Sequence, residues 1–346
     1  MQTESVKLPR LITPLIDALT NVVVIENGAI VKNTLSETAL TITNDMPQSL
    51  IDSLFQSDNP VVQHNQKAAE AAYTFKITAN RTLEAPINLF IIQKDRNMSQ
   101  NLTFIVGEHA GVTVNEYIYG NDGSTVDYVS QAVVEAAGKL DYHGIVNLDA
   151  ASISSINRMV SVKQDGKAFI KTAQMGNGNT QQDTRIDLLG PLAIGEIKTV
   201  ALSSAKQEVL IRSIIEHKAK HTEGLIEQYG VAADESFLMF EGVGKIHKGM
   251  SKSIAKQHNK GVVLGEKARL DANPLLLIDE YDVEAGHGAA IGQIDEEQLY
   301  YLMSRGLSEK DAQRLIINGY LHPLEKLLEN DIVKKHIESL LENKTA

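Results

Sequence analysis

Four segments at near-constant spacing decide the fold: EHAGVTV at 108–114, EAAGKLDY at 135–142, KQDGKAFI at 163–170 and LAIGEIKT at 192–199. Their glycines, Gly111, Gly138, Gly166 and Gly195, follow one another at intervals of 27, 28 and 29 residues. A repeat of strand, glycine turn and strand at this period predicts a stacked β-solenoid, in which each coil buries its apolar face against its neighbours. We expect the glycines to supply the positive-φ conformation at each turn. Evenly spaced hairpins in a β-sandwich are the alternative, because strand periodicity does not determine topology.

The spacing of apolar residues changes along the chain and divides it into three regions. Within residues 86–292, apolar and polar residues alternate in short segments, which is the period of β-strands, and we expect the solenoid core there. Residues 1–85 contain continuous apolar runs as well as apolar residues at helical spacing, which predicts a small N-terminal α+β cap. Residues 293–346 predict a C-terminal helical subdomain. The chain as a whole is therefore expected to be mainly β.

Capping signals mark three helices in the C-terminal region. Asp295 is expected to cap the first helix, which Gly306 ends, and Ser308 to cap the second, which Gly319 ends. Pro323 opens the third. The apolar residues of these helices exceed what covering one end of a β-helix requires. This favours a partner surface, with packing on the chain's own core as the alternative.

Composition excludes several classes of function. The 346 residues carry a net charge of −11 at pH 7, so neither nucleic acid nor an anionic membrane is an expected partner. No stretch approaches the roughly 20 apolar residues of a membrane span, and the first residues lack the layout of a signal peptide, which predicts a cytoplasmic protein. The chain has no cysteine. It cannot supply a thiolate to an enzyme, a zinc site or a cluster, so any metal ligand must be His, Asp or Glu.

Familiar catalytic and nucleotide-binding motifs are missing. The nearest candidate for a phosphate loop, EGVGKIHKGMSKS at 241–253, lacks the GxxxxGK[ST] spacing, and no Rossmann, HExxH or Gly-x-Ser-x-Gly motif occurs. His217 and His221 are four residues apart. On a helix they would share one face and could bind a metal, whereas on a strand they would lie about 13 Å apart, too far to share an ion. Carboxylates are too scattered to assign an acid–base pair.

His287 stands apart from the other histidines. Gly286 and Gly288 flank it, and Ala289 and Ala290 follow. Little side-chain bulk therefore lies beside it in the sequence, and another chain or an ion can approach the imidazole closely. The alternative is that these small residues mark tight packing at the end of a sheet, where the imidazole bonds a backbone carbonyl.

At this point the sequence resembles the SufB/SufD family of iron–sulfur cluster assembly proteins. The family's hallmark is a His-Gly-Ala stretch that runs into a helix with an acidic, Gln-Leu, aromatic and Ser-Arg-Gly pattern, and EAGHGAAIGQIDEEQLYYLMSRGLSE at 284–309 is similar to it. The stretches HKAKHTEGLIEQYGV at 217–231 and PINLFII at 86–92 also resemble family segments. The resemblance covers roughly residues 85–330.

Two departures favour the SufD side of the family. SufB-like chains carry a reactive cysteine after a Leu-x-Gly-Asp-Lys type turn, where this chain has Ala268, and a glutamate-rich stretch in place of Gly-His-Gly at 286–288. Many SufD-like chains have a cysteine two residues before the histidine, where this chain has Ala285, so that position cannot be a ligand. The N-terminal region also looks shorter than is usual in the family.

The resemblance implies a right-handed parallel β-helix that pairs with a SufB-like subunit, while the C-terminal helices dock a SufC-like ATPase. It implies a scaffold without catalytic residues of its own, which supports iron acquisition and the formation of a cluster on SufB. His287 is the expected metal ligand at the shared cluster, with Glu284 as a weaker candidate. The residues expected to dock the ATPase are Leu299, Tyr300, Leu302, Arg305 and Leu315. No cofactor is expected on this chain alone, flavin involvement stays open, and the isolated chain is expected to form a homodimer.

Two other functions stay open beside this one. A SufB-like subunit that carries the nascent cluster itself would need the cysteine that this chain lacks. A β-helix protein acting on polysaccharide would need a groove of charged residues on one face, normally in a secreted chain, with aromatic subsites. Neither a secretion signal nor such subsites are evident in the sequence.

Overall fold

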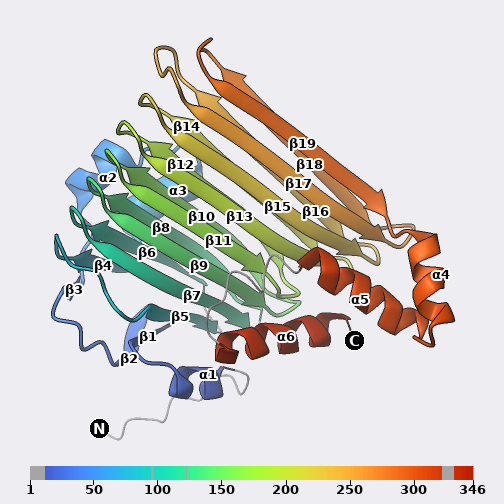
Figure 1. The fold of residues 1–346 in the computed structure, drawn as a ribbon. Coiled ribbons are helices and arrows are strands. Elements are labelled where there is room, and N and C mark those ends of the chain that lie inside the picture. The colour runs from blue at the N-terminus through green and yellow to red at the C-terminus, as the bar shows by residue number, and fades with distance from the viewer. Residues whose placement is uncertain (1–11, 95–96, 122, 322–330, 346) are drawn as a thin grey trace, which may run out of the picture.

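The computed structural model describes residues 12–94, 97–121, 123–321 and 331–345. Within them the chain winds between two sheets, so that successive strands of the coil fall alternately in one sheet and the other (Figure 1). The ten-stranded sheet has the order β19 (Glu284–Gln293), β17 (Ile254–Leu264), β15 (Glu223–Ala233), β13 (Ile194–Ser203), β11 (Lys167–Gln174), β9 (Lys139–Leu148), β7 (Gly111–Asn121), β5 (Ile87–Lys94), β1 (Val22–Glu26) and β2 (Ala29–Asn33). The nine-stranded sheet has the order β18 (Arg269–Ile278), β16 (Phe237–Ile246), β14 (Glu208–His217), β12 (Asn179–Leu188), β10 (Ile153–Val162), β8 (Thr125–Val134), β6 (Asn97–Val106), β4 (Ala71–Ile77) and β3 (Leu40–Thr43).

The pairings within both sheets are parallel from β1 and β4 onward, which confirms the β-helix prediction over the β-sandwich. Within the described ranges, the antiparallel strands are β2 and β3, which pair with β1 and β4 respectively. Both β1 and β4 lie in the expected N-terminal cap, yet they continue the sheets of the core. The division between residues 85 and 86 stays a prediction.

The space between the sheets is filled by columns of residues in parallel register. One column on the ten-stranded sheet consists of Ile87, Val114, Tyr142, Ile170, Ile197, Ile226 and Gln257, and each of them is buried. Side chains of a strand point alternately to its two faces, so every second residue joins such an inner column. The apolar part of this interior forms the main hydrophobic core.

Helices cover the outer faces. α1 (Thr13–Ala18), α5 (Glu309–Leu321) and α6 (Asp331–Thr345) pack against the ten-stranded sheet in a second apolar cluster (Figure 1). α2 (Gln48–Leu54) and α3 (Pro60–Ala68) flank the nine-stranded sheet, where α2 and α3 side chains meet β8 and β10. α4 (Glu296–Ser304) follows β19 directly and contacts α5. No helix of the described residues is both long and apolar enough to cross a bilayer.

The turns correct the prediction for glycine. Positive φ occurs at His109, Ala137, Asp165 and Leu192, and not at the four glycines of the repeat. Each of these residues precedes a small one, and the stacked positions are Ala110, Gly138, Gly166 and Ala193. A Cβ on Gly138 would lie 3.0 Å from the carbonyl oxygen of Glu135 and 3.2 Å from that of Gly107. A side chain on Gly138 would therefore crowd both its own turn and the preceding coil, although the equivalent positions Ala110 and Ala193 accommodate a Cβ, and the left-handed bend lies at the preceding residue.

The C-terminal helices largely follow their capping signals. The Asp295 side chain accepts hydrogen bonds from the backbone amides of Glu297 and Gln298, and Gly306 has φ +98° after the end of α4. The Ser308 hydroxyl accepts from the Asp311 amide at 3.1 Å at the start of α5. The expected stop at Gly319 is wrong: α5 continues to Leu321, because one helical glycine costs only about 1 kcal/mol and burial of Ile317 stabilises this turn. Pro323 lies outside the described residues.

Candidate functional site

His287 lies on the outermost strand of the ten-stranded sheet. β19 pairs with β17 on one side, and it ends the sheet on the other. β18 ends the nine-stranded sheet at the same end of the solenoid, beside β19 (Figure 1). All ten residues of β19 are exposed. Among the described residues, both sheets therefore finish in open edges of ten residues each.

The register places His287 at the end of a buried inner column. It pairs with Gln257, the last buried member of the column that begins at Ile87. Paired residues of a parallel sheet lie on the same face, so His287 occupies the inner side of the last coil. No further coil of the described chain covers it, which leaves it exposed. A Cβ added to either neighbouring glycine, Gly286 or Gly288, would have no atom within 4 Å, so approach to the imidazole is open.

Glu284 lies on the other face of the same strand. Its carboxylate forms an ion pair with Nζ of Lys256 on β17, at 2.6 Å. Because residues three apart in a strand point to opposite faces, the structure does not bring Glu284 and His287 together. Among the described residues, no group of three or more His, Asp or Glu side chains is close enough to hold a metal ion.

The interior below His287 is polar. Gln228, Gln257 and Asn259 are buried in the last coils. Gln257 ends a column whose earlier members are mostly apolar, whereas Gln228 and Asn259 follow Thr172 and Thr199 in a polar column. The Gln257 amide donates to the Leu275 carbonyl at 2.8 Å. The side-chain oxygens of these three residues have no partner among the described residues. Gly242 gives this amide room, because a Cβ there would lie 2.7 Å from Oε1 of Gln257.

The residues expected to dock an ATPase lie on α4 and α5. Tyr300 is 75% exposed and Leu315 is 52% exposed, while Leu299 and Leu302 are half-buried. Arg305 is exposed, and its guanidinium lies 5.1 Å from the ring centroid of Tyr301. Other large apolar residues extend this surface: Met303, Leu307 and Tyr320. The two helices thus present exposed apolar side chains together with charged ones, among them Arg305 and Arg314.

The pair of histidines noted in the sequence has separate positions. His217 ends β14 in full burial, with Nδ1 hydrogen-bonded to the Thr222 hydroxyl at 2.8 Å. Burial lowers the pKa of His217 to about 4. His221 lies in the following turn with φ +58°. His217 is therefore a neutral core residue at pH 7.

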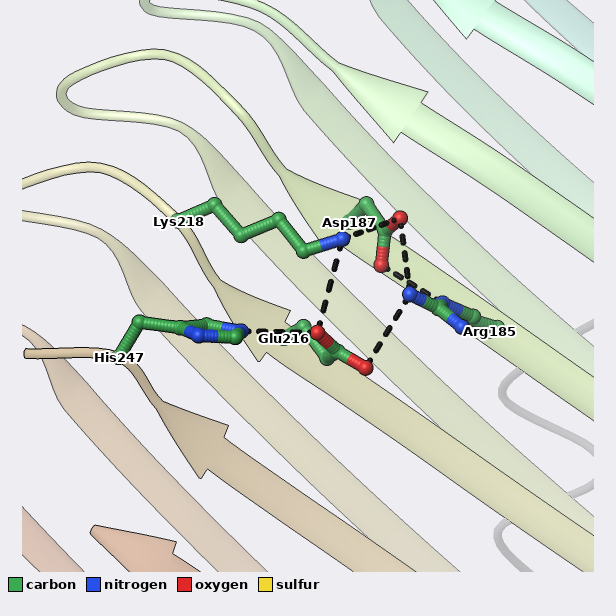
Figure 2. Close-up of polar contacts among 5 residues, drawn as sticks. All are labelled: Arg185, Asp187, Glu216, Lys218 and His247. Carbon is green, nitrogen blue, oxygen red and sulfur yellow. Dashed lines mark hydrogen bonds and ion pairs between the residues drawn. The ribbon is translucent and has the colours of Figure 1, made fainter. Parts of the chain in front are cut away.

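A charged network on the outer face of the nine-stranded sheet was not anticipated (Figure 2). Arg185 binds Asp187 at 2.8 Å and Glu216 at 3.1 Å, and Lys218 binds the same two carboxylates at 2.9 and 3.5 Å. His247 reaches Glu216 at 2.9 Å. Burial alone would raise the pKa of Glu216, but the hydrogen bond from His247 and the nearby cations lower it overall.

This network joins three consecutive coils, since its residues come from β12, β14 and the turns that follow β14 and β16. It borders a groove of about 320 Å³ between the sheet and the loop from α2 to α3. Each cation already contacts a carboxylate, so the network stabilises the stack more than it offers a charge to a ligand. The sequence feature that could have indicated this network is the recurrence of charged residues at equivalent positions of successive coils.

Comparison with known proteins agrees with this architecture. A family model described as the SufBD core domain of the SUF iron–sulfur cluster assembly system matches residues 90–320. SufD of Bacillus subtilis is 33% identical over 307 residues, which cover 85% of this chain and 70% of that protein. SufD of Escherichia coli K12 is 26% identical over 174 residues, 50% of this chain and 41% of the relative. A SufBD family protein of Staphylococcus epidermidis is 23% identical over 312 residues, 88% of this chain and 66% of the relative. The chain therefore belongs to the SufB/SufD family of iron–sulfur cluster assembly proteins, on its SufD side.

Proposed function

We propose that this chain is a non-catalytic scaffold subunit of a cytoplasmic SufBCD-type complex that assembles iron–sulfur clusters. A SufB-like subunit docks on the open end of the solenoid, and a SufC-like ATPase docks on α4 and α5. The observation that carries the proposal is the position of His287. It completes a buried column at the point where both sheets end in open edges.

Open edges favour docking by strand addition. Each of β18 and β19 leaves a row of backbone N–H and C=O groups for a further strand. A partner that adds strands there covers the exposed side of His287 and places its own residues beside the imidazole. In the isolated chain, a second copy meets the same edges and forms a homodimer.

The chemistry of His287 fits a ligand for iron held between two chains. Imidazole is a good iron ligand, and clusters with mixed His and Cys ligands are known. The cluster is the cargo of the complex. Because this chain has no cysteine, the partner supplies the thiolates, and this chain supplies one nitrogen ligand that also helps to acquire iron.

The test of the open end compares two histidines on neighbouring strands. The chain is co-expressed with its SufB-like and SufC-like partners, and cluster content is measured by visible absorbance and iron analysis of the purified complex. His287→Ala should leave assembly of the complex intact and lower the cluster content several-fold. The control is His258→Ala on β17, an exposed histidine on the outer face, which should change neither. An unchanged cluster content in His287→Ala would reject the ligand role.

The test of the helical surface uses two equally exposed leucines. Leu315→Asp should abolish capture of the SufC-like ATPase, because a carboxylate would lie in the centre of an apolar contact. Leu192 is also 52% exposed but lies in a turn of the solenoid, and Leu192→Asp should retain capture. If both variants bind the ATPase as the wild type does, the docking surface is not on α5.

A further inference from the structure

A cavity of about 420 Å³ lies where α5 and the end of α6 meet the edge of the solenoid. Its apolar lining is formed by Leu202, Leu264, Ile294 and Ile317. The polar lining comes from Ser204, Asp234, Gln313, Arg314 and Lys344. A volume of this size is within the range of small-molecule sites. The question is which ligand its charges would recognise.

The partners of Lys344 at this cavity, among the residues that the structure describes, are neutral groups. Its ammonium donates to the carbonyl oxygen of Gly176 and, at 3.0 Å, to Oε1 of Gln207. Gln207 is itself buried, and its amide donates to the carbonyls of Gly176 at 3.0 Å and Gly178 at 2.6 Å. This arrangement fixes the ammonium in place. An ammonium has three N–H donors, and among the described residues two of them have acceptors.

A half-buried cation whose partners are neutral is stabilised by a nearby negative charge. Burial lowers the pKa of Lys344 to about 7, and no carboxylate among its described partners offsets this effect. Arg314 lines the same cavity from α5, and its guanidinium bonds Asp311 of its own helix at 3.1 Å. The one described carboxylate in the lining, Asp234, accepts from the Ala205 amide at 2.7 Å. Asp311 offsets the charge of Arg314, so Lys344 is the cation of the lining that has no carboxylate partner among the described residues.

We propose that this cavity binds a small oxyanion, of the phosphate or carboxylate class, between Lys344 and Arg314. The anion takes the third N–H of Lys344 and a free N–H of Arg314 in charge-assisted hydrogen bonds. It thereby bridges α5 and α6 and holds them against the turns that follow β13 and β15. Binding of such an anion by the isolated chain does not depend on the proposed partners, so its failure would leave the scaffold function untouched.

The experiment titrates the full chain with inorganic phosphate and, separately, with succinate, by isothermal calorimetry. We expect saturable binding of at least one of them with a Kd below about 1 mM. Lys344→Met keeps the length of the side chain and should weaken binding at least tenfold, and Arg314→Gln should weaken it several-fold. Lys335, an exposed lysine of the same helix, provides the control, and Lys335→Met should bind as the wild type does. Phosphate binding without succinate binding assigns the site to phosphates, and the reverse assigns it to carboxylates.

Two results would overturn the proposal: no saturable binding of either anion to the wild type, or equal affinity in the wild type and Lys344→Met. If Lys344→Met does not fold, hydrogen exchange of the wild type decides. Ligand should slow exchange in residues 309–321 and 331–345 and in the turn at 203–207. Unchanged exchange in all three segments would reject the site.

Discussion

Among the described residues, one ion pair is fully buried inside the solenoid, and its removal offers a quantitative test of the fold. Glu116 on β7 is fully buried, and Arg158 on β10 is 2% exposed. Both Nη2 and Nε of Arg158 bond Oε2 of Glu116, and the Tyr142 hydroxyl donates to Oε1. Gly144 provides the space, because a Cβ there would lie 2.9 Å from Nη2 of Arg158. The perturbation is Glu116→Gln.

The expected cost follows from leaving a cation without its partner. Burial alone would lower the pKa of Arg158, but Glu116 beside it raises the pKa above its ordinary value, and a guanidinium cannot escape by losing its proton. Removal of one member of a buried pair costs about 3–5 kcal/mol. Replacement of both members by apolar residues, Glu116→Leu with Arg158→Met, should recover most of that loss, because no charge is then buried.

Guanidinium unfolding of the three variants, followed by circular dichroism, measures these differences. The control is Glu241→Gln, which removes the same charge from the exposed pair with Arg212 (2.6 Å) on the outer face, and it should cost less than about 1 kcal/mol. The reasoning is refuted if Glu116→Gln costs no more than Glu241→Gln. It is also refuted if the double replacement is as unstable as Glu116→Gln.

Three further predictions concern the core, the coil spacing and α4. Burial holds the pKa of His217 near 4, against about 6.5 in an unfolded chain, so the contribution of the neutral imidazole to stability is complete above pH ~6.5 and falls as the pH drops towards 4. Between pH 7 and 5 this contribution decreases by about 2 kcal/mol. In denaturant titrations at these two pH values, His217→Gln should lack this decrease. Gly190→Ala should destabilise by about 1–3 kcal/mol or more, since its Cβ would lie 2.0 Å from a backbone nitrogen of the preceding coil, whereas Gly292→Ala has no atom within 4 Å and should be near neutral by thermal unfolding. Asp295→Ala should cost α4 about 1 kcal/mol of local stability by removing its cap, seen as faster hydrogen exchange in residues 296–304; unchanged exchange would contradict it.

The strand period and the coil length were predictable because they follow from repetition. Alternation places every second residue inward, and a spacing of 27 to 29 residues brings Tyr142, Ile170 and Ile197 into one column. The conformation of the turn was not predictable in the same way. A Cβ on Gly138 or Gly166 would crowd the carbonyl of its own turn and that of the preceding coil, whereas the positive φ lies at Ala137 and Asp165. The local sequence does not show whether a glycine is needed because another coil lies close to it or because the backbone bends at it.

The candidate site, too, was predictable in part from the sequence and in part only from the structure. His287 was recognisable from its small neighbours and its resemblance to the family, but its place at the end of the inner column needed the register. The pair of Glu116 and Arg158 was not predictable, because each residue stands alone in an ordinary strand and the two are 42 residues apart. Lys344 was hidden for a similar reason. Its acceptors, Gly176 and Gln207, come from turns that only the stacking brings to α6.

The two ends of the solenoid are finished differently, and this difference carries the argument for a partner. At the first end, the chain turns back on itself: β2 and β3 have five and four residues, pair antiparallel with their neighbours and close the sheets with short edges. Short edges discourage further pairing. At the other end, β18 and β19 have ten residues each and run parallel to the strands with which they pair.

The last two strands are also unequal. Pro274 interrupts the hydrogen-bonding potential of β18, whereas residues 285–293 of β19 contain no proline and no Asp, Glu, Lys or Arg. Such charges and prolines are the usual protection of an exposed edge. β19 is therefore the better template for a partner strand, and it is the strand that carries His287.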